Sequence, residues 1–183
     1  MSSPTKPIHI AIFLPSPPQL LDLACVDLFA IMSRSYLSVI PDIPSSLVSL
    51  APEVKFSYVS LPSVSVMPTT AGTSVTITYS FLSPEVAPGQ VDIVLVPGPD
   101  PNETWDKEAL EWLRQQGETE GTELLSVCTG IFICGAAGML KGKTVCGPRG
   151  LQGMIRQKFP EVGEMMGERM RWWRDGRFWS CGE

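Results

Sequence analysis

Short apolar runs constrain the fold of this chain more than any other feature. Ile8 to Leu14, Val91 to Val96 and Glu123 to Val127 are five to seven residues long and mostly apolar. Such runs are typical of strands that are buried on both faces of a parallel sheet. Because helical patterns separate them, we expect an α/β, doubly wound domain with a mainly parallel sheet between helices.

The first helical pattern begins behind Ser16, which we expect to cap the helix, with Pro17 in its first turn. A second helix is predicted around Trp105 to Leu113, closed by Gly117 at a position that tolerates positive φ. The other expected elements are a loop over 41–52, strands over 54–60 and 75–79, and helices over 129–140 and 151–158.

The last stretch, MRWWRDGRFWS, alternates apolar and polar residues on either side of Asp175-Gly176. This is the pattern of a β-hairpin with a tight turn. We interpret the arginines in and just before this stretch as side chains on a solvated face of the hairpin: Arg169, Arg171, Arg174 and Arg177. The net charge of −5 and pI near 4.9 argue against nucleic-acid binding, so a small-molecule substrate is the expected partner.

With 183 residues, 44% of them apolar, the chain can form one domain over 1–183, with 1–7 as a flexible N-terminus. No cleavage pattern and no long apolar span is present, which predicts a cytoplasmic protein that does not cross a membrane. The five cysteines form no CxxC pair and accompany one histidine. We therefore expect reduced thiols and neither a metal nor another cofactor.

The segment LLSVCTGIFICGAAG places Cys128 where an apolar strand passes into a helix. A nucleophile elbow needs small residues two positions either side of the nucleophile, and here these are Ser126 and Gly130. The following helix would favour the thiolate of Cys128 and lower its pKa. A structural role is expected for the other four cysteines, which are Cys25, Cys134, Cys146 and Cys181.

Three segments, VDIVLVPGPDP, LLSVCTGIFICGAAGMLKGKTVCGPRG and RWWRDGRFWSCG, resemble the ThiJ/PfpI superfamily, whose fold is that of class I glutamine amidotransferases. Within it, the chain is most similar to fungal proteins near the isonitrile hydratases. The resemblance implies that Cys128 is the nucleophile and that Asp22, in QLLDLA, is a nearby acid or base. Asp27, further along this helix, is expected to be structural. Homodimers are common in the family, and we expect one here.

The sequence departs from the family pattern at three places. Pro97-Gly98-Pro99 replaces a PGG segment, and proline has no N–H, so the Thr129 and Gly98 N–H groups would have to stabilise a developing oxyanion. The histidine that many relatives have after the elbow helix is replaced by a segment ending in Arg149, for which substrate binding and a surface role both remain open. The chain also ends earlier than its relatives, which suggests a naturally short or a truncated member.

The leading hypothesis is a cysteine-dependent enzyme in which the Cys128 thiolate adds to a small electrophile and Asp22 moves the proton, as in isonitrile hydration. A glyoxalase-like reaction on 2-oxoaldehydes is an alternative, although the missing histidine counts against it. The third possibility is a non-catalytic redox-sensing or interaction protein, in which Cys128 is oxidised without substrate turnover.

Overall fold

The computed structural model describes residues 6–182, and its centre is a seven-stranded sheet. The strand order is β5-β2-β1-β6-β7-β9-β8, and every neighbouring pair is parallel except β8 with β9. The strands are β1 (Ile8–Phe13), β2 (Val54–Ser60), β5 (Tyr79–Ser80), β6 (Ile93–Val96), β7 (Glu123–Val127), β8 (Trp172–Asp175) and β9 (Phe178–Cys181). The mainly parallel α/β architecture expected from the apolar runs is confirmed.

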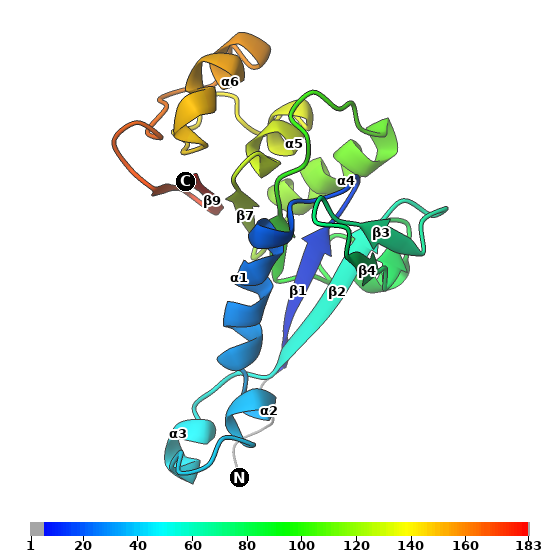
Figure 1. Ribbon diagram of the computed structural model, residues 1–183, viewed down its shortest axis with the longest axis vertical. Coiled ribbons are helices and arrows are strands. Elements are labelled where there is room, and N and C mark those ends of the chain that lie inside the picture. The colour runs from blue at the N-terminus through cyan, green and yellow to red at the C-terminus, as the bar shows by residue number, and fades with distance from the viewer. Residues whose placement is uncertain (1–5, 183) are drawn as a thin grey trace.

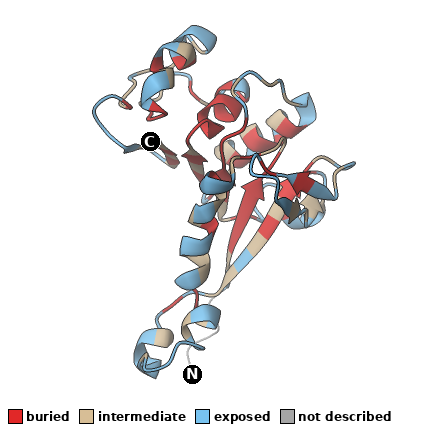
Figure 2. Ribbon diagram, in the orientation of Figure 1, coloured by how far each residue is buried: buried red, intermediate tan, exposed pale blue. Residues whose placement is uncertain are grey.

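Helices cover the two faces of the sheet unequally (Figure 1). The helix α1 (Leu20–Ile31) packs on one face, whereas α4 (Lys107–Glu118) and α5 (Gly130–Ala136) pack on the other. Alternate residues of β1 separate into these two cores: Phe13 packs with α4 and α5, and Ile12 with α1. Figure 2 shows this burial concentrated in the central strands and in α5.

Smaller elements surround this frame. The antiparallel ribbon of β3 (Val66–Pro68) and β4 (Ser74–Thr76) lies beside the β2 side of the sheet (Figure 1). The remaining helical elements are α2 (Arg34–Leu37), α3 (Ser45–Val48), α6 (Gln152–Lys158) and the 3-10 turns η1 (Pro84–Val86) and η2 (Arg149–Leu151). The 41–52 segment, predicted as a loop, therefore contains the short helix α3.

The predicted start of the first helix is wrong. α1 begins at Leu20, and its N-cap is Gln19, whose side chain makes no capping hydrogen bond. The Ser16 hydroxyl instead accepts a hydrogen bond from the indole Nε1 of Trp105 at 3.0 Å. This later start brings Asp22 into the first turn of the helix.

Two further boundaries differ from the prediction. Gly117 lies inside α4 without a positive φ, and a Cβ there would come within 2.4 Å of the Met139 side chain, so close packing accounts for this glycine. α5 ends at Ala136 because Gly138 turns the chain with a φ of 76°. The strand predicted over 75–79 is divided between β4, which pairs with β3, and β5, which pairs with β2.

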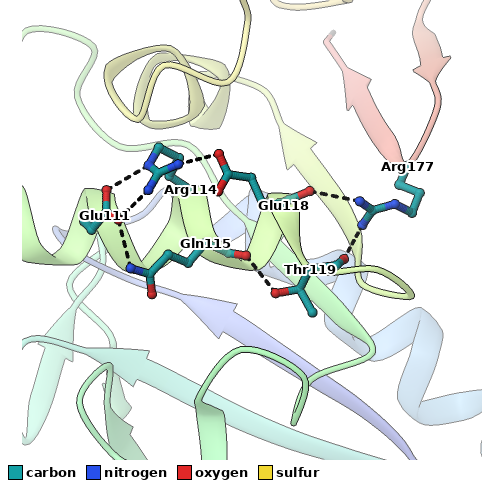
Figure 3. Close-up of polar contacts among 7 residues, drawn as sticks. Glu111, Arg114, Gln115, Glu118, Thr119 and Arg177 are labelled. Carbon is teal, nitrogen blue, oxygen red and sulfur yellow. Dashed lines mark hydrogen bonds and ion pairs between the residues drawn. The ribbon is translucent and has the colours of Figure 1, made fainter.

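The C-terminal hairpin is confirmed, with Gly176 at a φ of 63° between β8 and β9. Arg177, expected on a solvated face, is only half exposed and donates hydrogen bonds to the carbonyl oxygens of Gly117, Thr119 and Thr122. Figure 3 shows its guanidinium beside Thr119 at the end of α4. Because carbonyls at the C-terminus of a helix lack intrahelical donors, this guanidinium stabilises the end of α4.

Across residues 6–182, none of the helices has the length and apolar character needed to span a bilayer. The flexible N-terminus expected over 1–7 lies mostly outside the described residues.

Candidate active site

Cys128 lies at the sharp turn between β7 and α5, at the carboxyl edge of the sheet. Its φ is 53°, in the left-handed region that residues with a Cβ seldom adopt, and the residue is 6% exposed. The Cys128 N–H donates to the carbonyl oxygen of Cys181 on the neighbouring strand at 3.0 Å. Strained backbone of this kind persists only where surrounding contacts hold it, and it is concentrated at functional positions.

Gly130 explains how the turn can be this tight. A Cβ on Gly130 would lie 2.1 Å from the main-chain oxygen of Val96, which belongs to the adjacent strand β6. Only glycine allows the first residue of α5 to approach that strand so closely. Ser126, the small residue on the other side of Cys128, is 2% exposed. The contact with Val96 gives the glycine of the S-V-C-T-G pattern a steric reason, and Ser126 is buried in the strand before the turn.

Asp22 reaches the same edge from α1. It is 5% exposed, and its Oδ2 accepts a hydrogen bond from the Gly98 N–H at 2.8 Å. A buried carboxylate needs such donors, and the positive end of a helix dipole is a further stabilising field. By contrast Asp27, expected to be structural, is exposed on the same helix.

Gly98 joins Asp22 to the elbow. A Cβ built on Gly98 would lie 2.5 Å from Asp22 Oδ2, 2.3 Å from Thr129 Oγ1 and 2.9 Å from the Thr129 nitrogen. The carboxylate of Asp22 and the residue that follows Cys128 therefore face the same small space. The structure brings together Asp22, Gly98 and Thr129 beside Cys128.

Three hydrogen bonds hold the 97–99 segment in place. Its Gly98 N–H donates to Asp22, the Gly98 carbonyl accepts from the Gln19 N–H at 2.9 Å, and the Pro99 carbonyl accepts from the Thr129 hydroxyl at 2.7 Å. The Gly98 N–H that the sequence suggested as an oxyanion donor is thus engaged by a carboxylate. Gln19 and Cys181, which act here through main-chain atoms, carry no side-chain signal that sequence reasoning could have used.

Arg149 and the single histidine lie in opposite environments, the first exposed and the second buried. Arg149 lies exposed in η2, and its side chain forms neither a hydrogen bond nor an ion pair with another described residue. His9 is 5% exposed in β1, with Nε2 2.7 Å from the Ser57 hydroxyl and Nδ1 2.8 Å from the Gln90 carbonyl. Burial lowers the pKa of His9. Because His9 lies at the amino end of β1, away from the carboxyl edge, it does not serve as a base for Cys128.

The other cysteines have environments that oppose ionisation. Burial raises the pKa of the wholly buried Cys134 thiol to about 12 and that of Cys25 to about 11, and it also raises the pKa values of Cys146 and Cys181. Thiolate is the reactive form, so these four thiols are poor nucleophiles at neutral pH. Among the residues with described positions, no three His, Cys, Asp or Glu side chains form a group that could hold a metal ion.

These features define the class of protein: a doubly wound α/β domain with a cysteine on a strained elbow at the carboxyl edge of its parallel strands. Residues 44–177 match the DJ-1/PfpI family. The match covers well over half of the sequence, and the chain therefore belongs to the DJ-1/PfpI family. A search of curated proteins found no match.

Solved structures share the fold at low sequence identity. A ThiJ/PfpI family protein from Pseudomonas syringae has 20% identity and a TM-score of 0.69, over 97% of this chain and 63% of that one. Schizosaccharomyces pombe DJ-1 has 8% identity and a TM-score of 0.66, over 96% and 84%. A DJ-1 superfamily protein from Salmonella typhimurium has 14% identity and a TM-score of 0.67, over 96% and 81%. This chain thus spans less than two thirds of the length of the Pseudomonas protein.

Proposed function

We propose that this protein is a cysteine-dependent enzyme that hydrates a small carbon electrophile, with an isonitrile as the concrete substrate class. The observation that carries the proposal is the hydrogen bond from the Gly98 N–H to Asp22 beside the Cys128 elbow. This bond joins Asp22 to the 97–99 segment, and the Thr129 hydroxyl joins that segment to the elbow through the Pro99 carbonyl. The same bond engages a donor that an oxyanion would otherwise use, and Pro99 has no N–H to replace it.

The chemistry of isonitriles suits such a site. When the Cys128 thiolate attacks the terminal isonitrile carbon, a C–S bond forms and the new electron pair stays on that carbon, which takes a proton from the Asp22 carboxyl. Water then adds to the resulting thioimidate while the Asp22 carboxylate accepts its proton. The C–S bond breaks, the thiolate returns, and the hydroxyl proton of the adduct passes to nitrogen as the C=O bond forms, which gives an N-substituted formamide and leaves Asp22 protonated for the next cycle. The first step demands a proton donor at carbon rather than an oxyanion hole.

Amide hydrolysis and enediolate chemistry on 2-oxoaldehydes both build negative charge on oxygen, and removing one oxyanion donor costs about 100- to 1000-fold in rate. The engaged Gly98 N–H therefore favours hydration of an isonitrile over these reactions. Buried His9, held by Ser57 and Gln90, also leaves the site without a Cys-His pair.

The test is turnover of alkyl and aryl isonitriles, measured as formamide production, in the wild-type protein and in two matched variants. Asp22→Asn keeps an acceptor for the Gly98 N–H but cannot deliver the proton, so turnover should fall roughly 100- to 10000-fold. Asp27→Asn, on the exposed part of the same helix, should leave turnover unchanged. Equal activity of wild type and Asp22→Asn would overturn the mechanism, and methylglyoxal turnover without isonitrile turnover would overturn the substrate class.

A further inference from the structure

A groove of about 690 Å³ lies between α1 and the strands β6, β7, β9 and β8. Its walls are mainly apolar, with Leu28 on α1 and Met32 just after it on one side and Trp172 and Trp179 of the hairpin on the other. Two half-buried thiols also line it: Cys25 from α1 and Cys181 from the end of β9. Both thiols border the site built around Cys128 and Asp22, since, besides burial, the charge of Asp22 raises the pKa of each and the Cys25 thiol donates to the Asp22 carbonyl oxygen at 2.9 Å.

Sheet register places these two thiols on the same side of the sheet. Cys181 is paired with Val127, and paired residues in neighbouring strands point to the same face of a sheet. Val127 packs in the core on the α1 face, and Cys25 is part of that same core. The Cys181 side chain therefore emerges from the sheet on the face that Cys25 covers from above.

The electrostatics of the pair agree with this placement. After burial, the largest influence raising the pKa of Cys25 is the charge that Cys181 carries when ionised, ahead of Asp22. Asp22 is only one turn away from Cys25 on α1, and charge interactions fall with distance. The charges of Cys25 and Cys181 therefore interact, and, besides burial and Asp22, the charge of Cys146 also raises the pKa of Cys181.

We propose that Cys25 and Cys181 form an oxidisable thiol pair whose disulfide joins α1 to β9 across the groove. A low-molecular-weight disulfide such as glutathione disulfide is the oxidant. The Cys181 thiolate attacks one of its sulfurs and releases one glutathione. The Cys25 thiolate then attacks the Cys181 sulfur of the mixed disulfide and releases the second. The two protein S–H protons pass to the two released thiols, so atoms and electrons balance.

The disulfide would connect α1, which carries Asp22, to β9, which lies next to the Cys128 turn. α1 carries Asp22 three residues before Cys25, and the Cys181 carbonyl accepts the N–H of Cys128 at 3.0 Å. Since thiolate is the attacking species and burial raises both pKa values, the exchange should accelerate about tenfold per pH unit between pH 7 and 9. Reduced thiols at neutral pH and a cross-link under oxidising, mildly alkaline conditions are both expected.

The experiment treats the full chain, with Cys128→Ser in parallel, with glutathione disulfide at pH 8.5 and maps disulfides in an unreduced tryptic digest. Trypsin releases Cys25 in residues 1–34 and Cys181 in residues 178–183, each with no other cysteine. The expected result is a linked pair of these peptides and a melting temperature higher by about 5 to 15 °C, because a long loop is closed in the unfolded chain.

Variants sharpen the assignment. Cys25→Ser and Cys181→Ser should each lose the linked peptides and the rise in melting temperature, whereas Cys146→Ser should keep both. The proposal is overturned if Cys25 and Cys181 appear only as separate glutathione adducts, or if Cys181 is linked to Cys128 or Cys146 instead. Because the peptide map needs no substitution, a variant that fails to fold does not weaken the test. The outcome is also independent of any substrate.

Discussion

Two connections at the carboxyl edge of the sheet deliver the two residues of the candidate site, and they are built in opposite ways. Between β7 and α5 only Cys128 and Thr129 intervene, and Cys128 is strained, with a φ of 53°. Between β1 and α1 lie six residues, 14–19, three of them proline. The first connection is a tight turn, whereas the second is a long loop fixed by remote partners.

The difference shows what fixes the conformation of each connection. The tight turn is specified by its own sequence, since glycine at 130 permits the approach to β6. The long loop is held by groups far away in the chain. Gly98 and Thr70 form main-chain hydrogen bonds with it, and the Trp105 indole donates to its Ser16 hydroxyl. A substitution in the tight turn should therefore act directly, and one in the loop should act through its partner.

The largest effect is expected at the tight turn. Gly130→Ala would bring a Cβ within 2.1 Å of the Val96 main-chain oxygen, which cannot move without disturbing β6. We expect a loss of about 3 kcal/mol or more in the free energy of unfolding, measured by urea denaturation. Gly153→Ala in α6 is the control, because nothing lies within 4 Å of its added Cβ. It should stabilise the protein by about 0.5–1 kcal/mol. Similar values for both variants would contradict the packing argument.

A smaller effect is expected where the two connections meet. Gly98→Ala places a methyl group against the side chains of Asp22 and Thr129, which can shift, so the fold should survive. Because misplacing a catalytic group by about 1 Å can cost about 100-fold, turnover should fall by about that factor while the melting temperature changes little. Gly150→Ala, with nothing within 4 Å, should retain normal turnover. An unchanged turnover rate in Gly98→Ala would show that Gly98 does not position the catalytic groups.

The smallest effect is expected in the long loop. Ser16→Ala and Trp105→Phe each remove one partner of the hydrogen bond between the hydroxyl and the indole, at a cost of about 0.5–1.5 kcal/mol in unfolding free energy. Because they break the same bond, a double-mutant cycle by chemical denaturation should give a coupling of about 0.5–1 kcal/mol. Additive losses would indicate that Ser16 stabilises the helix start by itself.

This contrast also explains how much of the molecule the sequence could predict. The parallel α/β fold and the hairpin were predictable, since apolar runs and the Asp175-Gly176 turn are local signals. The start of α1 was not predictable, because the Ser16 hydroxyl bonds to the Trp105 indole instead of capping the helix. The Gln19 N–H, just before the helix, donates to the Gly98 carbonyl. The engagement of the Gly98 N–H by Asp22 follows from that later start. It depends on contacts between segments about 75 residues apart, which no local pattern reports.

The most direct test of the account is the pH dependence of alkylation at Cys128, with Cys25 and Cys134 in the same molecule as references. Peptide mass spectrometry can follow each thiol, since cleavage after Phe132 separates Cys128 from Cys134. Both reference thiols have raised pKa values, about 11 and about 12, so their modification should stay slow until well above neutral pH.

The account predicts that Cys128 is modified well below pH 8.5, about the pKa of a free thiol, and much faster than either reference. This result would show that the elbow produces a reactive thiolate. Modification of Cys128 no faster than Cys25 would contradict the central claim, and the strained turn would then have to be explained without nucleophilic chemistry.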